Sequence, residues 1–131
     1  MLFRSMERQY LNSKIHKATV THSNIDYEGS CEIDVALLKL ANIDPYERID
    51  IYDITNGERL STYAIPGKPD TGIIGINGAC CHKIKIDDEI IICTYTMLNE
   101  NECVNHKPTI IYVNQSNQII EKPLNQKLNA I

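Results

Sequence analysis

The sequence predicts a mainly β protein, a small closed β-barrel with one or two short helices. Short runs rich in isoleucine, valine, threonine and tyrosine recur along the chain, separated by turn residues, and this is the pattern of a small barrel. Two Asn-Gly pairs, Asn56-Gly57 and Asn77-Gly78, follow such runs. Asn-Gly is the strongest short hairpin signal, because both central residues of a type I′ turn need positive φ.

Six strands are expected from these runs. The run at 14–21 is rich in Val and Thr, and the run at 48–54 alternates Ile49 and Ile51 with Asp50, which is typical of a strand with one buried face. The expected strands cover residues 14–21, 48–54, 60–65, 72–76, 89–97 and 109–113.

One stretch has convincing helical character. It begins at Asp34, a good N-cap, continues with apolar residues to Ala41, and is followed by Asn42, which suits a helix exit. Residues 66–69 form an expected loop. From residue 114 the chain turns polar, so we expect residues 114–131 to be mostly a flexible tail.

The whole chain, residues 1–131, is predicted to be one domain. Thirteen basic and seventeen acidic residues give a net charge of −4 without a basic block, which argues against nucleic-acid binding. The longest apolar runs are too short to span a bilayer, and the first residues lack a signal-peptide pattern. Five cysteines, an odd number without a C-x-x-C pair, favour free thiols. We therefore expect a cytoplasmic protein with no membrane or nucleic-acid partner.

The segment Tyr-Glu-Gly-Ser-Cys at 27–31 carries the most specific chemistry. A Gly-Ser pair is usually a plain turn, but glycine tolerates backbone geometry that other residues resist, so Gly29 can present its carbonyl to the Ser30 hydroxyl. Attack of that hydroxyl would convert the amide to an ester, provided that a donor stabilises the oxyanion. Elimination and hydrolysis would then leave an N-terminal ketone, a pyruvoyl group.

Three blocks of sequence resemble the aspartate 1-decarboxylase family. The first runs from 14 to 31 and contains the Gly29-Ser30 pair, the second covers 51–65, and the third is Ile-Asn-Gly-Ala-Cys-Cys-His at 76–82. Their order and spacing fit the family without insertions. The resemblance extends over about residues 6–113.

This resemblance implies a pyruvoyl-dependent decarboxylase that cuts itself between Gly29 and Ser30, giving a β chain, 1–29, and an α chain, 30–131. Ser30 would become a pyruvoyl cofactor that forms a Schiff base with L-aspartate and withdraws electrons as CO2 leaves. The product would be β-alanine, for pantothenate and coenzyme A synthesis. The resemblance also implies a six-stranded double-psi β-barrel and a homotetramer with sites at subunit interfaces.

The resemblance also assigns roles to side chains. Arg59 would anchor the carboxylate that stays, since a guanidinium binds a carboxylate through two hydrogen bonds. Tyr63 would donate the proton that replaces CO2. Thr62 would support the oxyanion during self-cleavage and also touch substrate, and Lys14 would be a second cation near the site. Substrate contacts or pocket positions are further implied for Tyr27, Asn77, Gly78, Ala79 and Cys80.

Strand geometry sets a condition on these roles. On a regular strand Arg59 and Tyr63 share a face but lie about 13 Å apart, while Thr62 points to the other face. A single straight strand therefore cannot bring all three to one aspartate. Either a bulge or strand end re-aims them, or the pocket lies between subunits.

Other interpretations stay open at this point. The cysteines and histidines at 80–82 and 103–106 suggest a metal, but they lack the paired spacing of zinc sites, so we expect none. A pyruvoyl decarboxylase of another acidic amino acid such as glutamate is one alternative, because the presence of Arg59 indicates an acidic substrate but not the length of its side chain. An unprocessed barrel that acts as a binding or assembly module is another, and cleavage that stops at hydrolysis, leaving an N-terminal serine, is a third. Self-cleavage could be spontaneous or could need a maturation factor.

Overall fold

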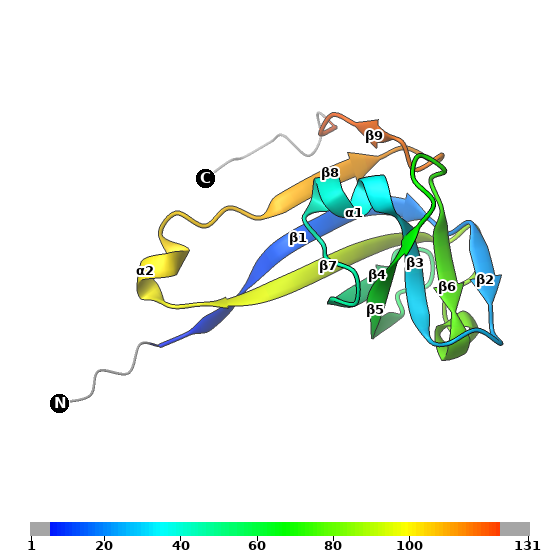
Figure 1. Ribbon diagram of the computed structural model, residues 1–131, viewed down its shortest axis with the longest axis horizontal. Helices are drawn as coiled ribbons and strands as arrows, with labels where there is room; N and C mark the ends of the chain where they lie inside the picture. Colours follow the sequence, from blue (N-terminus) through cyan, green and yellow to red (C-terminus); the bar gives the residue numbers. More distant parts are fainter. Residues whose placement is uncertain (1–5, 124–131) are drawn as a thin grey trace.

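The computed structural model describes residues 6–123, in which strands are the main secondary structure (Figure 1). Nine strands, two α-helices and one 3-10 helix are formed by these residues, which confirms the predicted mainly β class with short helices. No helix among them is long and apolar enough to cross a membrane. The elements are β1 (Arg8–Thr19), β2 (His22–Asn24), β3 (Ser30–Asp34), α1 (Val35–Ala41), β4 (Arg48–Asp53), β5 (Arg59–Gly67), β6 (Ile74–Asn77), η1 (Gly78–His82), β7 (Glu89–Leu98), α2 (Glu100–Cys103), β8 (Thr109–Val113) and β9 (Ile119–Ile120).

The strands are hydrogen-bonded in the order β2-β6-β3-β5-β4-β7-β1-β8-β9. β5 joins the two halves of this sheet, because its first part pairs antiparallel with β4 and its last part pairs parallel with β3. The change of neighbour falls between Tyr63, opposite Arg48, and Ala64, opposite Cys31. Figure 1 shows the long β1 and β7 running across the molecule, with β3, β6 and β2 standing across them at one end. The sheet thereby curls around one core, and the pairings within residues 6–123 leave β2 and β9 as its edges.

Isoleucine side chains fill the core. Ile49 and Ile51 on β4 are fully buried, as their alternation with polar residues predicts, and Ile90 and Ile92 on β7 do the same from the neighbouring strand. Full burial of each such side chain contributes roughly 1.5–3 kcal/mol. The buried apolar core residues are Ile15, Ala18, Val20, Cys31, Ile33, Leu37, Leu38, Ala41, Ile43, Ile49, Ile51, Ala64, Ile74, Ile76, Cys81, Ile84, Ile90, Ile92 and Val113.

The predicted helix is confirmed as α1, with the predicted ends. Asp34 accepts a hydrogen bond from the backbone N–H of Ala36 at 2.8 Å, as an N-cap does. Asn42 ends the helix in the left-handed conformation with φ of 58°. Asp34 also accepts from the N–H of Gly72 at 2.9 Å, so the cap ties α1 to the loop before β6.

The two Asn-Gly pairs have different outcomes. Asn56-Gly57 lies in the predicted hairpin between β4 and β5, but the turn is not the expected type I′, because Gly57 has φ of +80° whereas Asn56 does not have positive φ. The hairpin expected at Asn77-Gly78 is wrong: β6 ends at Asn77 and leads into the 3-10 helix η1. Gly78 does have positive φ, +72°, but it serves a close backbone approach that is described below.

Three of the nine strands were not expected, so the count of six is corrected. β2, β3 and β9 are short or mix polar and apolar residues, and they exist because neighbouring strands pair with them. Part of the predicted tail belongs to the fold: Ile119 and Ile120 pair with β8, and buried Asn117 hydrogen-bonds the carbonyl groups of Thr19 and Gly72. The remainder of that predicted tail, 124–131, lies outside the described residues.

Two buried carboxyl groups, Asp53 and Asp88, meet where β4 ends and β7 begins. Asp53 Oδ1 accepts from the backbone N–H of Thr55 at 2.8 Å and of Asn56 at 3.2 Å, whereas Oδ2 is buried and receives no hydrogen bond. Burial, and then the neighbouring Asp88 carboxyl group, raise the pKa of Asp53 to about 6. Two carboxyl groups in one buried site favour a state in which one is protonated.

The substitution Asp53→Asn should stabilise the protein at neutral and basic pH. Because folding raises the pKa of Asp53 from 3.8 to about 6, its contribution favours the folded state in acid and is lost as the pH rises through about 6. The amide carries no charge at any pH, so the variant should gain roughly 1–3 kcal/mol, or several degrees in melting temperature, near pH 8, about half of that near pH 5 and little near pH 4. Thermal unfolding across this range measures the effect. A variant that melts at or below the wild-type temperature near pH 8 would contradict the assignment.

Candidate functional site

Ser30 is the first residue of β3 and is 1% exposed. Its hydroxyl donates to the carbonyl oxygen of Glu28 at 2.9 Å and accepts from Asn77 Nδ2 at 3.1 Å. The second bond follows from the sheet, because Ser30 and Asn77 are directly opposite in the antiparallel pair of β3 and β6. A serine hydroxyl is thus held in a buried place next to the Gly29–Ser30 peptide bond.

Gly78 packs against the backbone of Gly29. A Cβ atom at position 78 would lie 2.7 Å from Gly29 Cα, 2.9 Å from Gly29 N and 3.2 Å from the Tyr27 carbonyl oxygen. Positive φ and this contact both require glycine at position 78. The Tyr27 side chain itself is 53% exposed. The segment before Ser30 is therefore held through its backbone.

Thr62 reaches the same region through η1. The Thr62 side chain lies close enough to half-buried Cys80 to affect its thiol, and Ala79 is the exposed residue beside Cys80 on η1. Burial and the neighbouring Cys81 raise the pKa of the Cys80 thiol, and the Thr62 side chain offsets this only in part. The structure therefore brings Ser30, Asn77, Gly78, Cys80 and Thr62 into one cluster, which we call the serine cluster.

Arg59, Tyr63 and Lys14 make their contacts elsewhere in the chain. The Arg59 guanidinium carbon lies 4.6 Å from the centroid of the Tyr52 ring, a cation–π contact between paired residues of β5 and β4. Tyr63 stacks on Tyr46 with ring centroids 6.2 Å apart, and Thr62 and Tyr63 line one open groove. Lys14 lies opposite Cys93 in the β1–β7 pair. The side chains with predicted substrate roles thus fall into separate groups within the chain.

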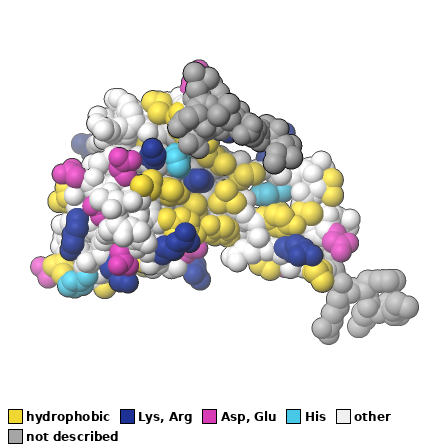
Figure 2. All heavy atoms as spheres, turned by 180° about the vertical axis from the view of Figure 1, so that it is seen from behind, with side chains coloured by type: hydrophobic (Ala, Val, Ile, Leu, Met, Phe, Trp, Pro, Cys, Tyr) yellow, Lys and Arg dark blue, Asp and Glu magenta, His cyan; other side chains and the backbone are white. Residues whose placement is uncertain are grey.

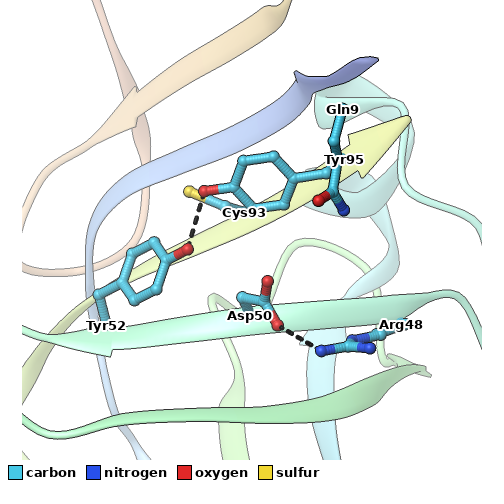
Figure 3. Close-up of a pocket in the computed structure, with 6 residues that line it drawn as sticks. All are labelled: Gln9, Arg48, Asp50, Tyr52, Cys93 and Tyr95. Carbon is cyan, nitrogen blue, oxygen red and sulfur yellow. Dashed lines mark hydrogen bonds and ion pairs between the residues drawn. The ribbon is translucent and has the colours of Figure 1, made fainter. Parts of the chain in front are cut away.

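A second hollow of about 420 Å³ lies on the sheet formed by β1, β7 and β4 (Figure 3). Within it the Tyr52 and Tyr95 hydroxyl groups are 2.8 Å apart, and Arg48 pairs with Asp50 at 3.6 Å. The hydrogen bond with Tyr52, followed by burial, raises the pKa of Tyr95. Its lining residues are Gln9, Arg48, Asp50, Tyr52, Cys93 and Tyr95.

Sequence reasoning missed the contact of Tyr52 with Arg59. A two-residue turn at Asn56-Gly57 would pair Tyr52 with Ser61, whereas the hairpin has a longer loop and pairs Tyr52 with Arg59. The pairing of Ser30 with Asn77 was also missed, because β3 was not expected. Among residues 6–123 no group of three or more metal-ligating side chains is found.

Comparison with known proteins gives consistent relationships. The model of a family described as aspartate decarboxylase matches residues 6–120. The chain is 47% identical to aspartate 1-decarboxylase of Ralstonia nicotianae, over 88% of this chain and 97% of that protein. It is 46% identical to aspartate 1-decarboxylase of Methylibium petroleiphilum, over 87% of this chain and 95% of that protein. The enzyme of that name from Psychromonas ingrahamii is 48% identical, over 88% of this chain and 91% of that protein.

The substitution Gly78→Ala should disturb the segment before Ser30 and slow any cleavage there. Its Cβ would overlap the Gly29 backbone, whereas a Cβ at Gly57, which has a similar φ of +80°, meets nothing within 4 Å. Gly57→Ala therefore controls for left-handed strain, about 1 kcal/mol. Melting temperatures and the fraction of cut chain on denaturing gels compare the two variants. Equal behaviour of both would show that the contact with Gly29 has no consequence.

Proposed function

Because the chain belongs to the aspartate decarboxylase family, we propose that it converts L-aspartate to β-alanine and CO2 for pantothenate and coenzyme A synthesis. The observation that carries the proposal is the buried Ser30 hydroxyl, held by Asn77 beside a glycine-lined Gly29–Ser30 bond. The activity depends on a pyruvoyl group made from Ser30. The free cysteines at positions 31, 80, 81, 93 and 103 suit the reducing cytoplasm, where we place the protein.

The residues around Ser30 fit the formation of this group. Attack of the Ser30 oxygen on the Gly29 carbonyl breaks the Gly29–Ser30 amide and forms an ester, with the hydroxyl proton ending on the Ser30 nitrogen. Elimination then removes the Ser30 Cα proton and releases the Gly29 carboxylate. Addition of one water and loss of one ammonia leave the ketone. Thr62 is our candidate for supporting the oxyanion of the first step, since its hydroxyl lies at the η1 side of the serine cluster.

The pyruvoyl group supplies a ketone that binds the substrate amine and withdraws electrons as CO2 leaves. The chain's own residues must hold the carboxylate that stays and provide a proton. Arg59 can do the first through two hydrogen bonds, and its stacking on Tyr52 holds the guanidinium in one orientation. Tyr63, in the groove beside Thr62, is our proton donor. Lys14 adds a second positive charge for a dianionic substrate.

A site shared between protomers reconciles the separate groups. Arg59 contacts Tyr52 at the start of β5, whereas the serine cluster is formed by β3, β6, η1 and Thr62 further along β5. We propose that each site combines the serine cluster of one protomer with Arg59 and Lys14 of another in a homotetramer. Figure 2 shows a broad field of hydrophobic side chains on one face of the protomer, as an interface requires. Large apolar side chains that are more than a third exposed include Tyr46, Met97, Ile110 and Ile119.

Mass measurement tests whether the chain is cut between Gly29 and Ser30 and carries a pyruvoyl group. Purified wild-type protein should give two fragments, 1–29 and 30–131, with the larger one lighter by one ammonia than a serine-started chain. Ser30→Ala should stay whole and should not turn over aspartate, because it has no hydroxyl to attack Gly29. For both proteins, an intact mass spectrum under denaturing conditions measures cleavage and a β-alanine assay measures activity. A wild-type chain that stays whole, even with a maturation partner from cell extract, would overturn the proposal in favour of an unprocessed binding module.

Complementation between two inactive variants tests the shared site. Ser30→Ala and Arg59→Gln chains, each inactive alone, should recover activity when co-expressed, because mixed tetramers contain some sites with both native residues. Random assembly gives about a quarter of wild-type activity for two-protomer sites. The measurement is β-alanine production by purified mixed tetramers carrying a different tag on each variant. No recovery in verified mixed tetramers would mean that Ser30 and Arg59 act within one protomer.

A further inference from the structure

A histidine and a glutamate lie in the row next to Ser30 on the same side of the sheet. In the β2-β6-β3 arrangement, Gly75 on β6 is opposite His22 on one side and Glu32 on the other. Two residues further along β6, Asn77 is opposite Ser30. Alternate residues of a strand share a face, so Glu32 and His22 belong to the face that carries the Ser30 hydroxyl and the Asn77 amide.

Gly75 leaves space between these two side chains. A Cβ at Gly75 would be 3.6 Å from Glu32 Oε1 and 3.6 Å from His22 Cβ, so the carboxylate lies over the glycine, toward the histidine. The His22 ring is tethered by its Nδ1 to Thr21 Oγ1 at 2.7 Å, and Thr21 is itself hydrogen-bonded to the Ile74 backbone. The imidazole is thus tethered to Thr21, and the carboxylate lies over Gly75, both beside the serine cluster.

Both side chains open into one cavity of about 600 Å³ that reaches Asn77. The cavity is partly open to solvent and large enough to hold water. Glu32 and Ser30 are about 6.6 Å apart along β3 between Cα atoms, a distance that a glutamate side chain and one water can bridge. The lining residues are Thr21, His22, Ser23, Asn24, Tyr27, Glu32, Asn77 and Ile86.

Self-cleavage at Ser30 needs a proton acceptor that the serine cluster lacks. The Ser30 hydroxyl donates to the Glu28 carbonyl oxygen, which cannot keep a proton, and Asn77 acts on Ser30 as a donor. We propose that Glu32 is the group that shuttles the proton of this step, with His22 beside it, and this inference rests on the proposed function. The hydroxyl proton passes through water to the Glu32 carboxylate as the new C–O bond forms. It returns to the Ser30 nitrogen as the C–N bond breaks, so atoms and charge balance.

The surroundings of Glu32 leave few groups that could replace it. On β5 its partner is Ile65, and on β6 its partner is Gly75, neither of which ionises. The ionisable groups that line the same cavity are His22 on β2 and Tyr27. The preceding residue, Cys31, points into the core, and its thiol pKa is raised by burial and then by Cys80 and Glu32. The other nearby carboxylates are Glu28, in the exposed turn before Ser30, and Asp34 at the end of β3, whose oxygens accept from the backbone N–H groups of Ala36, Asp70 and Gly72.

Cleavage kinetics of matched variants test the proposal. Wild type, Glu32→Gln, Glu32→Asp and Glu28→Gln are made by cell-free synthesis, so that the cut fraction can be followed from the start by intact mass at several pH values. Glu32→Gln should cut about 100-fold more slowly, the typical size of a general-base effect. The cleavage rate of wild type should fall in acid as a carboxylate is protonated, and the rate of Glu32→Gln should not show this fall. Glu32→Asp should recover most of the rate, and Glu28→Gln should match wild type.

Hydroxylamine, which cleaves esters, shows whether the variant is blocked before or after ester formation. Added to Glu32→Gln, it should release little extra fragment, because the ester does not form. Abundant hydroxylamine-sensitive chain would overturn the proposal, since the block would then follow ester formation. A wild-type rate in Glu32→Gln, an unchanged shape of its pH profile, or equal slowing by Glu28→Gln would do the same. A wild-type chain that is never cut would overturn the proposed function as well, whereas normal wild-type cleavage with unaffected Glu32 variants overturns this inference alone.

Discussion

The antiparallel pairing of β3 with β6 is the interaction on which the candidate site depends. It sets Ser30 opposite Asn77, so that the amide holds the hydroxyl, and it ends where Gly78 turns away with its backbone against Gly29. The same register sets Glu32 opposite Gly75, which keeps a side chain out of the space beside the carboxylate. A shift of one residue would send the Ser30 hydroxyl to the other face of the sheet. Local backbone pairing thus decides where the reactive group lies.

Buried carboxylates in this fold have opposite electrostatic outcomes, and backbone donors make the difference. Burial works to raise the pKa of Asp34, but hydrogen bonds from the backbone N–H groups of Gly72, Ala36 and Asp70 outweigh it and hold the pKa low. Asp53 has backbone donors for one oxygen only and shares its site with Asp88, so its pKa is raised. Asp34 therefore stabilises the helix cap and the loop in its ionised form, whereas burial of Asp53 favours its protonated form.

Features with a local physical cause could be predicted from the sequence. The cap at Asp34, the helix exit at Asn42 and the Asn56-Gly57 hairpin depend on residues close together in the chain, and the structure has all three. Strand β3 was missed although its sequence, Ser-Cys-Glu-Ile-Asp, alternates polar and apolar residues, because the run has only five residues, leads directly into α1 and is held by β5 and β6, which are distant in the sequence. For the same reason the contacts of the site residues were not visible. Ser30 was identified by its chemistry and by family resemblance, but its bond to Asn77 spans 47 positions.

The length of β1 has a consequence for a chain opened after Gly29. All of β1 lies before that position, and its pairing with β7 runs from Arg8 to Thr19, with β8 paired along its other edge. The leading fragment is therefore a central strand of the sheet rather than a removable propeptide. Once the bond is broken, the two pieces are a two-chain assembly held by sheet hydrogen bonds and core packing alone. After denaturation, the two pieces would have to associate again in a bimolecular step. The yield of refolded protein would therefore depend on protein concentration, whereas refolding of the uncut precursor would not.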